Sequence, residues 1–237
     1  MKKNFVLAIM AMFTLASQAQ IVSSRSSRVT TTTTQGLYED YNTIYLQWNP
    51  SSFSSDKISS KSFNGFSAGY NHAFSLSQAL PLYVEAGLGA QFSIWSDEID
   101  DVDMKIHMVS AKIPVSFSYK WDIPNSSFSI IPNVGLDFRF NIVGKFKIDY
   151  PDEYLEYYGK NVQDSYNLFD KDDMDIIGKA LVGDKDTWNR FQVGWHIGVN
   201  FMYNNTFMLG ASYGTDFSEI AKDCKIRTGS ITLGYCF

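Results

Sequence analysis

Apolar and polar positions alternate along most of the chain after residue 40, and the alternation divides it into eight segments. In residues 82–95, for example, Leu82 and Val84 share one face, whereas Tyr83 and Glu85 share the other. A period of two is typical of β-strands. The predicted strands are residues 43–48, 65–74, 82–95, 106–121, 128–146, 191–203, 207–213 and 225–237.

The two faces of these strands differ in composition. One carries Val, Leu, Ile, Phe, Tyr and Trp, and the other carries Gly, Ser, Asn, Gln and scattered charges. A membrane barrel turns its bulky face to lipid, whereas a soluble barrel of the lipocalin kind turns it inward. Because glycine at every second position makes a poor soluble surface, the pattern predicts an all-β fold, an eight-stranded antiparallel up-and-down transmembrane β-barrel.

The connections between the strands alternate in length. Those after the second, fourth and sixth strands are short, and the last of these is the pair Asn204-Asn205. Open sheet edges are not tolerated in hydrocarbon, so the strands should close into a ring over residues 41–237. Short turns are typical of the periplasmic end of such barrels and long loops of the outer end, which places both termini in the periplasm.

The N-terminus has the features of an export signal. Lys2 and Lys3 precede an apolar stretch at residues 5–15, which is shorter than the roughly 20 residues a membrane-spanning helix needs. Ser17 and Ala19 supply the small residues of a cleavage site. We therefore predict a signal peptide at residues 1–19, a flexible periplasmic leader at 20–40, and an outer-membrane location.

The chain ends with Tyr235, Cys236 and Phe237, an aromatic-x-Phe pattern. With this terminal pattern and its eight amphipathic segments, the chain resembles the outer-membrane β-barrel proteins of Bacteroidota-type bacteria, the PorT-like barrel family. The resemblance covers about residues 40–237. The resemblance implies that Tyr235 and Phe237 form a signal that the barrel-assembly machinery reads. Some members of that family serve protein secretion across the outer membrane and many have no assigned role, and the resemblance provides no catalytic residues.

Four charges fall on the small polar faces of three neighbouring strands: Glu85, Lys112, Asp137 and Arg139. A lone charge in a narrow lumen is costly, so these side chains should pair with one another or with Gln91, Asn133 and His196. The lumen of an eight-stranded barrel is about filled by side chains. We therefore expect a lumen plugged by one ion-pair network.

Two predicted external loops are strongly acidic. Residues 97–103 hold five carboxylates in seven positions, and residues 148–189 hold eleven Asp or Glu against four Lys. The longer loop could include a helix at residues 172–182. Aromatic side chains between carboxylates suit recognition of an envelope protein or a glycan; these are Tyr150, Tyr154, Tyr157, Tyr158, Tyr166, Phe169 and Trp188. The alternative is a solvated loop facing lipopolysaccharide phosphates.

A cation site in this loop is conceivable from four clustered carboxylates, Asp170, Asp172, Asp173 and Asp175. A calcium loop of the EF-hand type would need other residues at Met174 and Asp175, so the match is incomplete. No metal-spaced Cys/His set is present in the sequence, and no metal or cofactor is expected. Cys224 and Cys236 lie about 40 Å apart on one extended strand, so they should not form a disulfide.

The sequence offers no catalytic motif of the GxSxG or HExxH type. His107 and Ser110 are separated by three positions, so they lie on opposite faces of one strand and cannot form a dyad. We expect no enzymatic activity and no catalytic residues, with a lipid-modifying enzyme as a distant alternative. A net charge of −5 gives no reason to expect nucleic acid.

The sequence therefore predicts a small outer-membrane barrel with a structural or surface-interaction role through its acidic loops. An accessory role in protein secretion or envelope assembly is the alternative. The expected partners are outer-membrane lipid or lipopolysaccharide, the barrel-assembly machinery, and an envelope protein or glycan.

Overall fold

A computed structural model describes residues 38–54, 62–99, 102–151, 164–177, 187–221 and 224–237. Residues 38–237 form one compact unit. The predicted signal peptide and residues 20–37 of the predicted leader lie outside the described residues. Within the described residues, no helix is long and apolar enough to span a membrane.

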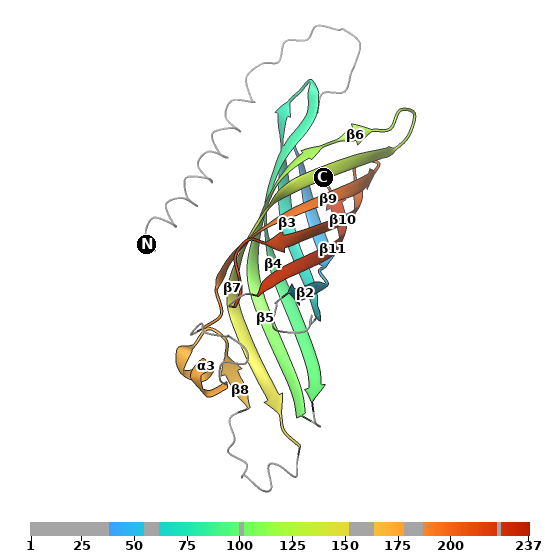
Figure 1. Ribbon diagram of the computed structural model, residues 1–237. Helices are drawn as coiled ribbons and strands as arrows, with labels where there is room; N and C mark the ends of the chain where they lie inside the picture. The colour runs from blue at the N-terminus through green and yellow to red at the C-terminus, as the bar shows by residue number, and fades with distance from the viewer. Residues whose placement is uncertain (1–37, 55–61, 100–101, 152–163, 178–186, 222–223) are drawn as a thin grey trace, which may run out of the picture. The chain divides into compact units, whose positions relative to one another are not determined.

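Antiparallel strands make up almost all of this unit (Figure 1). The elements are β1 (Tyr41–Trp48), β2 (Ser51–Ser54), β3 (Ser62–Ser77), β4 (Leu80–Ile99), β5 (Val102–Tyr119), β6 (Trp121–Asp122), β7 (Phe128–Asp149), β8 (Ser165–Asn167), α3 (Lys171–Ile177), β9 (Phe191–Tyr203), β10 (Phe207–Asp216) and β11 (Lys225–Cys236). Among the described residues, eight strands pair in the order β1–β3–β4–β5–β7–β9–β10–β11. Pairing of β11 with β1 closes the ring, which confirms the predicted eight-stranded barrel.

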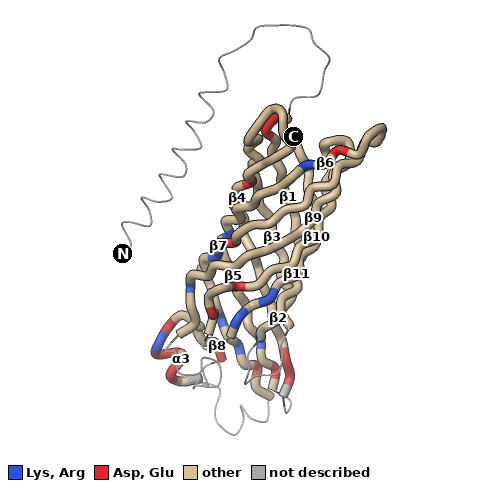
Figure 2. Tube along the Cα trace, turned by 45° about the horizontal axis from the view of Figure 1, so that its top comes forward, with Lys and Arg blue, Asp and Glu red and all other residues tan. Residues whose placement is uncertain are grey.

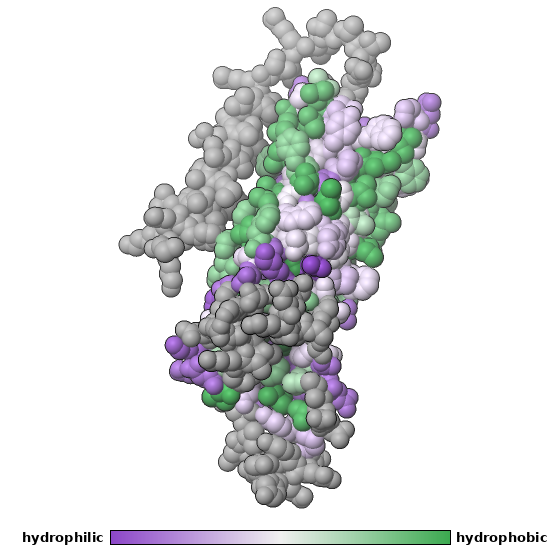
Figure 3. Space-filling view, in the orientation of Figure 1, coloured by the Kyte–Doolittle hydropathy of each residue, from purple (hydrophilic) through white to green (hydrophobic). Residues whose placement is uncertain are grey.

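The strand register places the bulky side chains outside the ring. Leu233 of β11 lies opposite Leu46 of β1 and Leu209 of β10, and all three are more than half exposed, at 61%, 65% and 52%. Figure 3 shows such hydrophobic residues along the barrel wall, with hydrophilic residues concentrated toward the end that carries α3. The apolar face therefore points outward, as expected for a membrane barrel and opposite to the lipocalin arrangement.

The small residues face inward, where they make room for larger neighbours. Tyr45 of β1 is buried in the lumen, at 7% exposure. A Cβ atom added at Gly69 or at Gly89 would lie 2.5 Å from the Tyr45 hydroxyl oxygen. Alternating glycines on β3 and β4 therefore let one phenol ring cross a narrow lumen.

Two of the short turns depend on asparagine. Asn204 and Asn205 have φ values of 51° and 55°, and Asn125 has a φ of 57°. Asparagine tolerates this left-handed region better than most residues because its short amide can bond to the local backbone. The tight connections at this end of the barrel were predicted from the sequence, and the structure confirms them.

The acidic stretch at residues 97–103 was predicted to be a loop, and this prediction was wrong for most of its length. Residues 97–99 belong to β4 and residues 102–103 to β5, with Glu98 opposite Asp103. Lys105 supports this hairpin through ion pairs to Asp103 at 3.4 Å and to Asp149 of β7 at 2.8 Å. The bond from Asp149 raises the pKa of Lys105 above its usual value.

The 148–189 segment also contains ordered structure where it is described. Strand β7 continues to Asp149, and β8 pairs with the part of β7 that extends past the first residue of β9. Helix α3 covers the first part of the helix predicted at 172–182. A register shift between Val109 and Ser110 leaves Ile142 of β7 as an extra residue. This bulge shifts the phase of β7, so Phe146 lies inside the barrel, 2% exposed.

Both cysteines are free thiols, in agreement with the prediction that they form no disulfide, and both are buried. Burial, together with the charge of Glu219, raises the pKa of Cys224 to about 11. Because the thiolate is the reactive form, we expect N-ethylmaleimide at neutral pH to leave the folded protein unmodified and to add twice in urea. Intact mass before and after denaturation measures this, and rapid addition to the folded protein would contradict the burial of the thiols.

Candidate functional site

The lumen contains the charged side chains that the sequence singled out. Arg139 of β7 forms a buried ion pair with Asp216 of β10, across the intervening strand β9. Gln192 Nε2 donates to the same carboxylate at 3.1 Å. Gly194 of β9 lies directly opposite Asp216, and an added Cβ there would be 2.6 Å from Asp216 Oδ1. The glycine therefore permits the contact across a strand.

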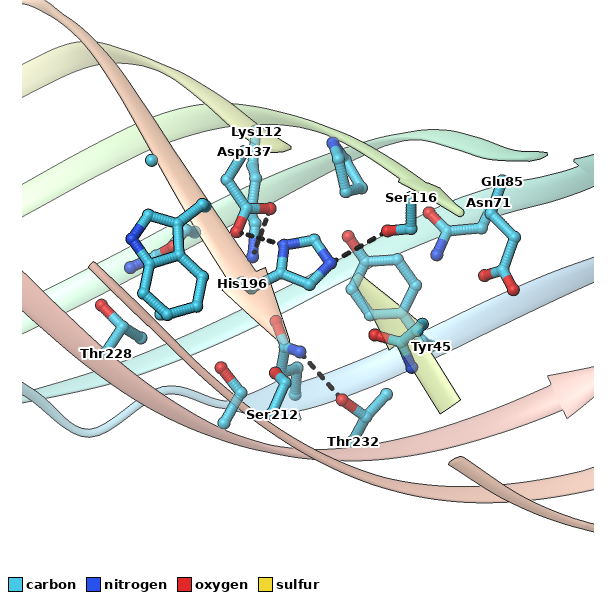
Figure 4. Close-up of a pocket in the computed structure, with 18 of the residues that line it drawn as sticks. Tyr45, Asn71, Glu85, Lys112, Ser116, Asp137, His196, Ser212, Thr228 and Thr232 are labelled. Carbon is cyan, nitrogen blue, oxygen red and sulfur yellow. Dashed lines mark hydrogen bonds and ion pairs between the residues drawn. The ribbon is translucent and has the colours of Figure 1, made fainter. Parts of the chain in front are cut away.

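A second group of polar residues lies further toward the short turns (Figure 4). Lys112 Nζ lies 3.3 Å from Asp137 Oδ1, and His196 Nδ1 lies 2.8 Å from Asp137 Oδ2. His196 Nε2 is 2.9 Å from the Ser116 hydroxyl. An ionised carboxylate only accepts, so Nδ1 donates to Asp137; in the neutral imidazole, Nε2 then accepts from the Ser116 hydroxyl.

Glu85 is separate from both groups, although the sequence analysis placed it in one network with Lys112, Asp137 and Arg139. Its Oε1 accepts from Ser118 at 2.6 Å and from Tyr41 at 3.3 Å. The reason is the register, because Glu85 lies opposite Ser116 of β5, and Lys112 is four residues further along that strand. Four residues of a strand span about 13 Å, which is beyond the reach of an ion pair.

Asp216 was not among the predicted site residues, because the seventh predicted strand ended at residue 213. The signal that could have found it is the inward alternation of Ser212 and Gly214, which continues to Asp216. His196 was expected to bond in the lumen, and it does so with Asp137 and Ser116.

Hydrogen-bonded amides form a layer next to the Arg139–Asp216 pair. Asn141 accepts from Ser110 at 2.6 Å and donates to Gln192 at 3.1 Å. On the opposite wall, Asn49 donates to Ser67 at 2.8 Å and accepts from Ser230 at 2.9 Å. These buried amides have partners from neighbouring strands, so they link adjacent strands on the inner face of the wall.

Apolar clusters lie at both ends of this polar region. The outer cluster contains Phe63, Trp95, Ile106, Met108, Phe146, Tyr166, Leu168, Met174, Trp188, Ile220, Ala221, Cys224 and Ile226. The cluster near the short turns contains Ile131, Met202, Met208 and Cys236, with Tyr41 packed against them. Tyr166 and Trp188 were expected on a recognition surface, but they are buried in the outer cluster and cannot contact a partner.

A cavity of about 90 Å³ lies among Tyr45, Glu85, Lys112, Asp137 and His196. This volume holds about three water molecules. Ser116, His196 and Asp137 have the bonding order of a serine hydrolase triad, but a cavity of this size has no room for an acyl substrate.

We expect Ser116 to be unreactive toward a fluorophosphonate probe, because the cavity is too small for the probe. The backbone N–H groups beside Ser116 are also engaged in the strand ladder and are not arranged as an oxyanion hole. Intact mass of the folded protein after exposure to the probe measures this. An adduct that disappears in Ser116→Ala would contradict the structural role of the three residues.

Two of the four carboxylates proposed as a loop cation site bond to the backbone around α3. Asp170 Oδ1 accepts from the backbone N–H of Asp172 at 3.0 Å, which caps the first turn of the helix. Asp173 Oδ2 accepts from the backbone N–H of Asn167 at 2.8 Å. Within the described ranges, no three His, Cys, Asp or Glu side chains converge as a metal site, and Asp175 is exposed.

Tyr235 and Phe237 lie on the outer face near the short-turn end of the barrel. Both side chains are exposed, and their ring centroids are 6.2 Å apart. The backbone of Phe237 exchanges two hydrogen bonds with Asn42, at 2.9 and 3.0 Å, so it completes the pairing with the start of β1. Their role as an assembly signal stays a prediction.

A ring of eight strands with an apolar exterior and a polar interior defines a membrane-spanning β-barrel. The chain belongs to the outer membrane protein β-barrel domain family, whose model matches residues 18–221. It is therefore an outer-membrane barrel protein. No curated protein matches the chain.

Several solved structures are similar to the chain. Ail, the attachment invasion locus protein of Yersinia pestis, in complex with the heparin analogue sucrose octasulfate, has a TM-score of 0.46 and 17% identity, covering 84% of this chain and 100% of that chain. Neisserial surface protein A has a TM-score of 0.40 and 14% identity, covering 85% and 98%. The outer membrane enzyme PagL has a TM-score of 0.38 and 10% identity, covering 79% and 97%.

Proposed function

We propose that this protein is a small outer-membrane barrel whose lumen is plugged by its own side chains. The observation that supports this proposal is the order of the layers that fill the lumen. From the outer end they are an apolar cluster, hydrogen-bonded amides, two groups of ion pairs and a second apolar cluster. The cavity between them, of about 90 Å³, is too small for a solute path. Export through a signal peptide at residues 1–19 is part of this proposal.

Liposome swelling tests the plug. Vesicles that contain the folded protein should swell in an isotonic solution of a small sugar no faster than empty vesicles do. A general porin in matched vesicles gives the positive signal. Swelling that rises with the amount of reconstituted protein would contradict a plugged lumen.

We further propose that the acidic outer segments make the contacts of this protein with an envelope protein or a glycan. Acidic residues, with basic residues among them, gather toward the end of the barrel that carries α3 and β8 (Figure 2). Glu98, Asp172 and Asp175 are exposed there. Tyr166 and Trp188 are buried in the interior, so the proposal rests on the exposed charges and not on these two aromatic residues.

Crosslinking in intact cells tests this surface role. The variant with Glu98→Gln, Asp172→Asn and Asp175→Asn should lose the crosslinked adducts of the wild type. A Glu39→Gln variant removes an exposed carboxylate at the opposite end of the barrel and should keep them. Adducts that survive in the triple variant would contradict a surface role for the acidic segments.

As a second proposal, the protein is a PorT-like barrel with an accessory role in secretion or envelope assembly. This proposal is supported by the exposed aromatic pair Tyr235 and Phe237 at the end of β11. Such an accessory would act through the short-turn end, so secreted proteins should change when the gene is deleted and recover with the acidic triple variant. An unchanged set of secreted proteins would contradict this alternative.

A further inference from the structure

The wall of the barrel contains a notch between two strands that both pair with β7. Strand β8 ends at Asn167, opposite Lys145, and β9 begins at Phe191, opposite Phe140. Ile142 and Val143 lie between these two ladders. A hollow of about 390 Å³ opens here, lined by Ile142, Val143, Lys145, Ser165, Asn167 and Asp173.

The floor of the notch is apolar and continuous with the lipid-facing wall. Ile142 is 53% exposed, and Val143 is also exposed. Two residues before Ile142, Phe140 lies exposed on the same outer face, next to Phe191. An apolar chain could therefore extend from the notch along the wall toward the middle of the membrane.

Cations lie directly beyond this apolar floor, in the direction of the outer end. His107 lies opposite Lys145, and Lys105 lies opposite Lys147, so two rows of basic residues cross β5 and β7. Lys105 is engaged with Asp103 and Asp149. In the part of the chain that the structure describes, neither Lys145 nor Lys147 forms an ion pair, and both are exposed.

Arg190 adds a cation at the other end of the notch. Its Nη1 donates to the carbonyl oxygen of Ile142 at 3.2 Å, and its guanidinium carbon lies 4.4 Å from the centre of the Phe169 ring. Arg190 is itself exposed. The notch therefore has an apolar floor with positive charge on both sides, in a chain whose net charge is −5.

We propose that this notch binds a phosphorylated glycolipid of the outer leaflet. The phosphate would lie at Lys145, near Asn167 and Ser165, and an acyl chain would lie over Ile142 and Val143. Ammonium groups bind phosphate as point charges. The succession of apolar and basic positions along β7 matches the orientation of a lipid in the membrane, and a soluble anion would make no use of the apolar floor.

One feature of the notch opposes the phosphate. The Asp173 carboxylate forms part of the wall, where it accepts a hydrogen bond from the backbone of Asn167 at 2.8 Å. Its negative charge should weaken binding of a phosphate at Lys145. Asp173→Asn keeps the shape of the side chain and removes the charge, so this variant should bind the phosphorylated lipid more tightly.

Native mass spectrometry of the full chain in detergent, titrated with lipid A and with dephosphorylated lipid A, tests the proposal. Loss of one charge-assisted contact corresponds to about a tenfold change in affinity. The wild type should prefer the phosphorylated lipid by about that factor, and Lys145→Gln should lose the preference. Lys225→Gln, which removes an exposed lysine of β11, should keep it.

Three outcomes would overturn the proposal. The first is equal binding of the two lipids by the wild type, and the second is an equal loss in Lys145→Gln and Lys225→Gln, which would indicate diffuse charge attraction. The third is displacement of the lipid by inorganic phosphate at equal concentration, which would indicate a site for the free ion. Each variant should first show the same change in gel mobility on heating as the wild type. This control excludes misfolded protein from the comparison.

Discussion

Asp216→Asn is expected to lower the free energy of unfolding by about 3–5 kcal/mol, because it leaves the Arg139 guanidinium buried without a counter-charge. Both side chains are nearly inaccessible, at 8% and 7% exposure. Urea unfolding in lipid vesicles, followed by tryptophan fluorescence, measures the change. Asn can still accept from Gln192, so the loss reports the charge and not the hydrogen bond.

Two controls separate this pair from a general effect of charge. The double variant Arg139→Met with Asp216→Leu removes both charges and should recover most of the lost stability. Asp149→Asn removes an exposed partner of Lys105 and should leave the unfolding midpoint unchanged. A loss below about 1 kcal/mol for Asp216→Asn would show that the pair does not hold β7 and β10 together.

Leu233→Arg is expected to cost about 2–4 kcal/mol, because it places a charge within the apolar, lipid-facing side of β11. Leu233 lies between Leu46 and Leu209, so the apolar belt surrounds it on both sides. Tyr235→Arg lies nearer the end of the strand and should cost only about 0–1 kcal/mol. The same unfolding assay in vesicles measures both losses of free energy of unfolding. Equal losses at the two positions would contradict the claim that Leu233 lies deeper in the membrane than Tyr235.

The architecture could be predicted because strand alternation is local and is repeated eight times. Residues 82–95 and 225–237 each show which side chains share a face, and burial in the structure follows those faces, with Tyr83 inside and Leu233 outside. The outward direction of the apolar face also followed from composition, because glycines on the opposite face suit a narrow lumen. Each of these inferences needs only the sequence of one strand.

The pairing of the inner charges could not be predicted in the same way. Which side chains meet across the lumen depends on the stagger between strands, and alternation says nothing about stagger. Asp216 reaches Arg139 across β9, whereas Glu85 bonds only to hydroxyl groups. Of the four predicted inner charges, Lys112 and Asp137 do pair, whereas Arg139 and Glu85 have partners outside the predicted network.

The burial of aromatic side chains at the outer end of the barrel could not be predicted from the alternation within single strands. Strict alternation from Phe140 would place Phe146 on the lipid face, but the extra residue at Ile142 turns it into the lumen. Tyr166 and Trp188 pack beside Phe146 in the outer cluster. An acidic, aromatic segment that looked like a recognition loop therefore also provides the outer apolar closure.

Single-channel recording in planar lipid bilayers tests the plugged lumen most directly. Inserted protein should give no steady conductance, because two apolar clusters close the ends of a lumen whose central cavity is only about 90 Å³. Insertion is verified in the same membranes by protection from added protease. Discrete, long-lived conductance steps from the folded wild type would contradict the account.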